Sequence, residues 1–168
     1  MSSKNLKNQN NKKTKSPLKF LYNKEILYLI IIGTVGLVIR LYYFPFNIPI
    51  IDDGIDYFSY AVVSSQQGQL PVNWGLSNNG WPVFLSYFFS IFNSQNFLEF
   101  TYLQRSLTII ISVLTIIPVY FLCKRFVNKK IAIISTTLFV FEPRIIINSL
   151  IGITEPAYIL LGTISLFL

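Results

Sequence analysis

The sequence contains no histidine and a single cysteine, Cys123. Without histidine, the chain can build no histidine base, no histidine metal site and no Ser-His-Asp triad. One thiol cannot form a disulfide within the chain, so cysteine usage does not indicate a redox compartment. Charged residues are also scarce, at 12% of 168 residues, whereas 52% are hydrophobic and 16% are aromatic. Long apolar runs in such a composition are typical of a membrane protein.

The net charge of +7 is concentrated in two places. Seven lysines precede the first apolar run, and four further cations separate two later runs. They are Lys4, Lys7, Lys12, Lys13, Lys15, Lys19 and Lys24, and then Lys124, Arg125, Lys129 and Lys130. Basic residues that flank apolar runs indicate the cytoplasmic side of a membrane protein. Neither cluster lies on a foldable soluble surface, so we expect no nucleic-acid partner.

The apolar runs predict an all-α, polytopic membrane protein with a cytoplasmic N-terminus. Residues 1–24 read as a disordered basic tail, and residues 25–168 as one transmembrane module. Pro118 predicts a kink in the second span, and Glu142-Pro143-Arg144 a break in the third. The fourth helix starts at a threonine cap, Thr154, and is cut at Leu168, which suggests a truncated or N-terminal piece. The predicted spans are 26–44, 99–123, 131–148 and a fourth from about 156.

The segment 45–98 is predicted to be an extracytoplasmic loop that carries short interfacial helices. Helical spacing of apolar residues indicates one such helix, with Asp53 as its N-cap and Gly68 as its C-cap. Residues 70–82 contain Asn79-Gly80 and two prolines, which favour turns and loop. Residues 83–92 are apolar but too few to cross a bilayer, so we expect a second interfacial or re-entrant helix.

This loop begins with three carboxylates in five residues: Asp52, Asp53 and Asp56. The expected topology also places Glu99, Glu142 and Glu155 outside, and it places Arg40, Arg105 and Arg144 at the outer ends of three spans. Arginine binds phosphate through a planar fork that lysine lacks. Acids and arginines at one depth would form a phosphate pocket beside a catalytic acid. The alternative is that the arginines reach lipid headgroups or pair with nearby acids for stability.

Several of these segments resemble the GT-C membrane glycosyltransferases, the group of the protein O-mannosyltransferases and the lipid A aminoarabinose transferases. Asp53-Gly54-Ile55-Asp56-Tyr57, followed by Ala61 and Gly68, resembles the pattern that follows their first span. Asn79-Gly80-Trp81-Pro82-Val83-Phe84-Leu85 resembles their Pro-Pro-Gly-Tyr-Pro-Leu-Phe-Leu segment, without the double proline. Glu142-Pro143 and Thr154-Glu155-Pro156 resemble the end of their third helix and the entry to their fourth.

The resemblance covers residues 20–168, the N-terminal part of such enzymes, and implies a hexosyltransferase. The sugar would pass from a polyprenyl-phosphate donor to an acceptor protein or glycolipid on the extracytoplasmic side, with Asp53 as general base. Asp56 and Asp52 would support this base. Gly54 differs from the family pattern, because many relatives carry an acid at this position. Arginine would stabilise the leaving lipid phosphate. As a separate piece of 168 residues the chain is expected to be inactive, because the family's donor pocket uses further spans.

Other roles for the same residues stay open at this stage. Tyr57 and Trp81 would stack on sugar or belong to an aromatic belt at the membrane surface. Glu155 would bind substrate or simply favour the start of its helix. No metal site is assigned, although Asp52, Asp53 and Glu155 together would suit a divalent cation as cofactor. Asp53 would serve as a helix cap as well as a base.

Two other classes of function compete with the transferase. One is a non-enzymatic membrane protein, such as a transporter fragment or an assembly subunit, whose acids would pass ions. Acids at mid-membrane depth would favour it, whereas these are expected at the outer ends of the spans. The other is a lipid-phosphate hydrolase, and the lack of histidine counts against its common phosphohistidine route.

Overall fold

The computed structural model describes residues 24–168, apart from 73, 77–78, 93 and 95. Regular structure in these residues is entirely α-helical. The predicted basic tail lies outside the described residues except for Lys24. The helices are α2 (Lys24–Tyr42), α3 (Asp53–Gln67), α4 (Gly80–Ile91), α5 (Phe97–Leu114), α6 (Ile116–Phe126), α7 (Lys129–Val140), α8 (Pro143–Ile151) and α9 (Glu155–Phe167).

Two stretches of the described chain are long and apolar enough to cross a membrane: Lys24–Tyr42 and the continuous pair Phe97–Phe126. A third is formed by α7 and α8 if this pair, bent by 47°, counts as one span. The helices α4 and α9 are apolar but shorter. The all-helical class is therefore confirmed, with two or three spanning candidates, and the four-span topology and its orientation stay predictions.

The predicted break of the third span is confirmed, whereas the second span, predicted to kink at Pro118, has a one-residue interruption and continues as one spanning candidate. The helix pair α5–α6 is interrupted at Thr115, one turn before Pro118. Proline has no N–H with which to bond the carbonyl one turn earlier, so the ladder breaks there. The second break separates α7 from α8, and Glu142 caps the new helix by accepting the N–H of Ile145 at 2.8 Å. Pro143 follows in the first turn, where its missing N–H costs nothing.

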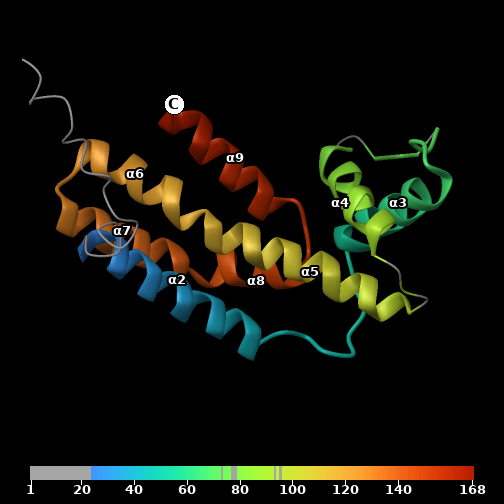
Figure 1. Cartoon of the computed structure of the whole chain (residues 1–168), viewed down its shortest axis with the longest axis horizontal. Coiled ribbons are helices and arrows are strands. Elements are labelled where there is room, and N and C mark those ends of the chain that lie inside the picture. The colour runs from blue at the N-terminus through green and yellow to red at the C-terminus, as the bar shows by residue number, and fades with distance from the viewer. Residues whose placement is uncertain (1–23, 73, 77–78, 93, 95) are drawn as a thin grey trace, which may run out of the picture.

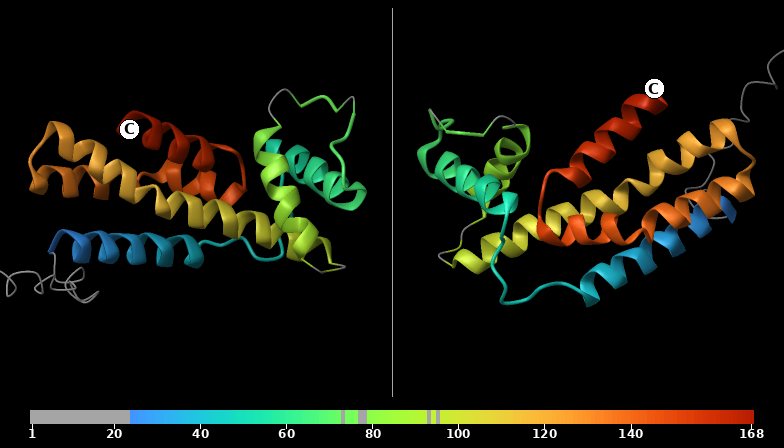
Figure 2. Two further views of the ribbon diagram at one scale, coloured as in Figure 1. Left: turned by 45° about the horizontal axis from the view of Figure 1, so that its top comes forward. Right: turned by 180° about the vertical axis from the view of Figure 1, so that it is seen from behind.

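The long helices lie side by side, and the short pair α3–α4 sits at one end of α5 (Figures 1 and 2). Helix α2 packs against α5 and α7, while α8 and α9 both contact α5. The last helix, α9, diverges from the bundle toward its C-terminal end (Figure 1). The junction of α8 and α9 lies near the end of α5 that carries α3, because Gln104 of α5 donates to the carbonyl oxygens of both Gly54 and Gly152.

At the opposite end of the bundle, a cluster of charges joins three helices. The Glu25 carboxylate of α2 accepts a hydrogen bond from the Tyr120 hydroxyl at 2.6 Å and from Lys124 Nζ at 2.7 Å, both of α6. Lys129 of α7 forms a second ion pair with the same carboxylate. The cations predicted to mark the cytoplasmic side are thus partly used to hold the helix ends together.

Helices α2 and α7 approach so closely that a glycine is required between them. A Cβ added at Gly36 would lie 2.6 Å from Val140 Cγ1, a distance that side chains do not tolerate. Small residues at helix interfaces allow backbones to approach in this way in membrane proteins, where packing supplies much of the association energy. The buried Gly36 therefore fixes the seam between these two helices.

The pair α3–α4 has its own apolar core against α5. Buried side chains from the loop before α3, from α3 itself and from α4 form one cluster, and Phe100 and Leu103 of α5 pack against it. The cluster comprises Ile50, Phe58, Ala61, Trp81, Leu85 and Phe89. This core attaches the predicted outer loop firmly to the bundle.

Both short helices begin earlier in the chain than predicted. Helix α3 has Asp53 as its first residue, and the N-cap position belongs to Asp52, whose side chain makes no capping hydrogen bond. The prediction of Asp53 as N-cap is therefore wrong, whereas Gly68 does end the helix in the left-handed conformation, with φ 66°. Helix α4 starts at Gly80, so Gly80-Trp81-Pro82 are helical rather than loop. Proline is tolerated in the first turn, which explains the early start.

Candidate functional site

Asp52, Asp53 and Asp56, here called the acidic corner, lie at the start of α3 with exposed side chains. Asp52 has φ 53° and ψ −146°, a backbone conformation that costs free energy in a residue other than glycine. Within the part of the chain that the structure describes, none of the three carboxylates forms a hydrogen bond or an ion pair. The carboxylates are therefore accessible to a ligand, on a backbone that turns sharply just before the helix.

Close packing fixes the backbone beneath the acidic corner. Gly54 is buried, and a Cβ there would lie 2.5 Å from Ile50 Cγ2 and 3.2 Å from the Ile151 carbonyl oxygen. The amide of Gln104 donates to the carbonyl oxygen of Gly54 at 3.3 Å and to that of Gly152 at 2.7 Å. Gln104 of α5 therefore joins the first turn of α3 to the junction of α8 and α9.

Arg105 holds the loop that leads from α2 to the acidic corner. Its guanidinium donates to three carbonyl oxygens, those of Pro45 at 3.2 Å, Ile48 at 2.6 Å and Pro49 at 3.0 Å. Two of the acceptors are prolines, and the side chain is 3% exposed. Arg105 was predicted to bind phosphate, but its terminal nitrogens are used to shape this loop.

Arg40 lies in the interior of the bundle and is fully buried. Its Nε donates to Ser149 Oγ at 3.1 Å, and one terminal nitrogen donates to Ser112 Oγ at 3.0 Å. The other terminal nitrogen donates to the Gly36 carbonyl oxygen at 3.0 Å. Arg40 therefore joins α2 to α5 and α8. Neutral oxygens solvate its charge here, as a buried charge requires.

Arg144 is exposed in the first turn of α8. The sequence predicts it at the outer end of the third span, and α8 continues from it to Ile151, about two helical turns further. No hydrogen bond or ion pair among the described residues joins Arg40, Arg105 or Arg144 to one another or to the acidic corner. The structure does not bring the three arginines together, and phosphate binding stays a prediction that Arg144 alone is free to fulfil.

A buried polar stripe on α5 escaped the sequence analysis. The residues are Thr101, Gln104, Thr108, Ser112 and Thr115. Their spacing of three or four residues puts them on one face of the helix. The Thr108 hydroxyl donates to the Ser149 carbonyl oxygen of α8 at 2.7 Å. This spacing of polar residues inside an apolar run was the signal that could have revealed the stripe.

The predicted substrate-binding residues are distributed over different environments. Trp81 is 4% exposed and belongs to the core of α3–α4, where its ring stacks on Phe84 with centroids 5.4 Å apart. Tyr57 is half-buried and packs against the same core. Glu155 is exposed in the first turn of α9. The junction before it touches Gly54, so Glu155 lies at the same end of the bundle as the acidic corner.

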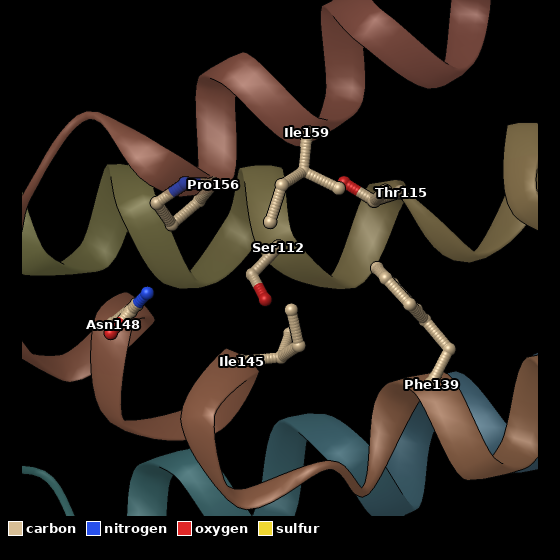
Figure 3. Close-up of a pocket in the computed structure, with 7 residues that line it drawn as sticks. All are labelled: Ser112, Thr115, Phe139, Ile145, Asn148, Pro156 and Ile159. Atoms are coloured by element: carbon tan, nitrogen blue, oxygen red, sulfur yellow. The ribbon is translucent and has the colours of Figure 1, made fainter.

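A small cavity of about 10 Å³ lies between α5, α7, α8 and α9 (Figure 3). Its lining is mostly apolar, with the Ser112 and Thr115 hydroxyls and the Asn148 amide as polar members. A cavity of this size holds about one water molecule. No predicted site residue lines it, although Ser112 links it to Arg40.

The described residues contain no group of three or more histidine, cysteine, aspartate or glutamate side chains placed to hold a metal ion. The alternative metal site of Asp52, Asp53 and Glu155 is therefore not formed in this arrangement.

No protein-family model, no curated protein and no solved structure matches this chain. The acidic corner, the contacts beneath it and the helix arrangement are thus the observations on which a function has to be argued.

Proposed function

We propose that the chain is the N-terminal module of a membrane glycosyltransferase of the GT-C type, with the acidic corner as the catalytic end. The observation that carries the proposal is a set of three exposed carboxylates on a tightly held backbone. Gln104 and Gly54 hold the first turn of α3, and Arg105 holds the preceding loop. Positioned general bases need such a support, because small displacements of a catalytic group are costly.

In the proposed reaction a hydroxyl or amine of the acceptor attacks the anomeric carbon of the sugar. Asp53 takes the proton that the attacking group loses, and the bond between the anomeric carbon and the phosphate oxygen breaks. The polyprenyl phosphate leaves with the bonding electrons, and the sugar carbon is inverted. Asp56, one turn along α3, and Asp52 support the base, while Glu155 and Tyr57 are candidates for contacts with the substrates.

The leaving phosphate needs charge stabilisation more than protonation. Arg40 and Arg105 donate to protein oxygens in this structure, so the donor-phosphate role falls on Arg144 among the predicted arginines. Arg144 sits about 12 Å along α8 from Gly152, at 1.5 Å per residue. This separation favours a donor that extends along α8, with its phosphate at one end and its sugar near the acidic corner.

The placement of the charges supports an extracytoplasmic site. The lysine-rich end of the bundle, with Glu25, Lys124 and Lys129, is opposite the end that carries α3 and α4. Basic residues mark the cytoplasmic side, so the acidic corner would face outward. A polytopic protein of the cell membrane with its N-terminus in the cytoplasm fits this arrangement.

The test is transfer from a radiolabelled polyprenyl-phosphate sugar by membranes that contain the protein encoded by the complete gene. Asp53→Asn keeps the size of the side chain and removes the base, so we expect transfer to fall by about 100-fold or more. The matched control is Glu99→Gln, which neutralises an exposed acid in the first turn of α5 and should leave transfer near the original rate. Undiminished transfer by Asp53→Asn would remove Asp53 as the base.

A further inference from the structure

A hollow of about 500 Å³ lies between α4, α5 and α9, separate from the acidic corner. Helix α4 contributes Trp81 and Phe84, α5 contributes Ile111, and α9 contributes Leu160 and Leu161. The volume is that of a typical ligand pocket, and the lining is almost entirely apolar. A groove of this kind on a membrane protein suits an extended apolar chain.

Two polar atoms without partners distinguish this hollow from a plain apolar groove. Trp81 Nε1 and Thr154 Oγ1 are both buried, and neither has a hydrogen-bond partner among the residues that the structure describes. Both residues line the hollow. Thr154 occupies the N-cap position of α9, yet its hydroxyl makes no capping bond, so the helix does not use it. Unpaired buried donors are unfavourable, and an acceptor supplied by a ligand would relieve them.

We propose that this hollow binds the acyl chain of an ester-linked membrane lipid, whose ester carbonyl accepts hydrogen bonds from Trp81 and Thr154. Thr154 lies at the start of α9 and Trp81 in the first turn of α4, and the lining of α9 beyond Thr154 is mostly apolar through Leu161, about 10 Å along the helix. A lipid ester stands at this same boundary between a hydrocarbon chain and a polar headgroup. The inference goes beyond sugar transfer and does not depend on it.

The charges around the hollow favour a neutral acceptor over a phosphate. No arginine or lysine lines it, and the residue next to Thr154 is the exposed acid Glu155. A phosphate at this position would meet a carboxylate without a compensating cation, which is unfavourable at low dielectric. An ester carbonyl carries no charge and satisfies the same two donors.

Tryptophan fluorescence tests the proposal directly, since the chain has only Trp74 and Trp81. With Trp74→Phe as background, the protein is reconstituted in phosphatidylcholine vesicles with either plain or acyl-brominated chains. We expect bromine to quench Trp81 strongly, although this side chain is only 4% exposed to solvent. Adding Ala157→Leu, which narrows the hollow, should remove most of the quenching. Equal quenching with and without Ala157→Leu, or none in either, would overturn the proposal.

A second measurement tests the hydrogen bond from Thr154 without narrowing the hollow. Thr154→Val removes the hydroxyl at nearly constant volume, and it should weaken retention of ester lipid on the purified protein by about 2- to 10-fold, as expected for one hydrogen bond. Thr137→Val is the matched control, because that hydroxyl bonds only within α7 and lies outside the hollow. Retained lipid is identified by mass spectrometry. Unchanged retention in Thr154→Val, or retention of polyprenyl phosphate in place of an ester lipid, would contradict the assignment.

Discussion

Gly54→Ala tests how firmly the acidic corner is held. The new methyl group would lie 2.5 Å from Ile50 Cγ2 and 3.2 Å from the Ile151 carbonyl oxygen. Ile50 is 1% exposed and the second contact is backbone, so neither neighbour can move aside easily. Overpacking of a dense core costs about 1–3 kcal/mol, against a helix-propensity gain of at most about 1 kcal/mol. We expect net destabilisation of about 1–2 kcal/mol.

The assay is denaturation of the purified protein in detergent micelles, with Gly162→Ala as the matched control. Gly162 is in α9 with nothing within 4 Å of its Cβ position, so alanine there should stabilise the helix slightly. Ile50→Leu removes the clashing Cγ2 at constant volume, and combining it with Gly54→Ala should recover part of the loss. A Gly54→Ala protein as stable as the Gly162→Ala protein would refute the packing argument.

Three further predictions concern the bundle itself. Gly36→Ala should destabilise by about 1–3 kcal/mol, because its methyl group would meet Val140 Cγ1 at 2.6 Å, and a melting temperature no lower than that of Gly162→Ala would contradict this. Arg40→Lys should lower the free energy of unfolding by about 1–3 kcal/mol, because one ammonium cannot reach both Ser112 and Ser149 as the guanidinium does. Unfolding in denaturant measures this loss, and an unchanged midpoint concentration would contradict the prediction. Glu25→Gln should lower the melting temperature at low salt and less so at 1 M NaCl, because it removes the ion pairs with Lys124 and Lys129; a loss that does not depend on salt would exclude this cause.

The positions of the helices could be predicted from the sequence because local signals determine them. Run lengths of apolar residues fixed α2, α5–α6 and α7–α8 to within a few residues, and Pro118 and Pro143 marked the two breaks. Gly68 ended α3 as predicted, since a left-handed residue is needed there. Each of these features depends on a few neighbouring residues, and tertiary contacts did not alter them.

The hydrogen-bond partners of the arginines could not be predicted, because they depend on which helix faces pack against each other. Arg40 and Arg105 looked like ligands for phosphate because they stand at the ends of apolar runs. In the fold, Arg40 faces two serines from distant helices, and Arg105 faces three carbonyl oxygens of the loop before α3, two of them from prolines. The anchoring role of Gln104 was missed for the same reason: its two acceptors are about 50 residues away on either side.

The acidic corner could be predicted from the sequence only in part. Its carboxylates are exposed as expected, whereas their support came from contacts that no local pattern encodes. The metal alternative required Glu155 of α9 beside Asp52 and Asp53 of α3, and the described residues bring no such group of three together. Trp81, predicted as a sugar platform or belt residue, became core because α4 begins at Gly80 and turns its ring inward.

The most direct test compares sugar transfer by Asp52→Asn, Asp53→Asn and Asp56→Asn in membranes with equal amounts of each protein. If the acidic corner supplies the base, Asp53→Asn should lose about 100-fold or more, and the other two variants should lose less. Transfer within twofold of the unaltered protein in all three variants would contradict the account.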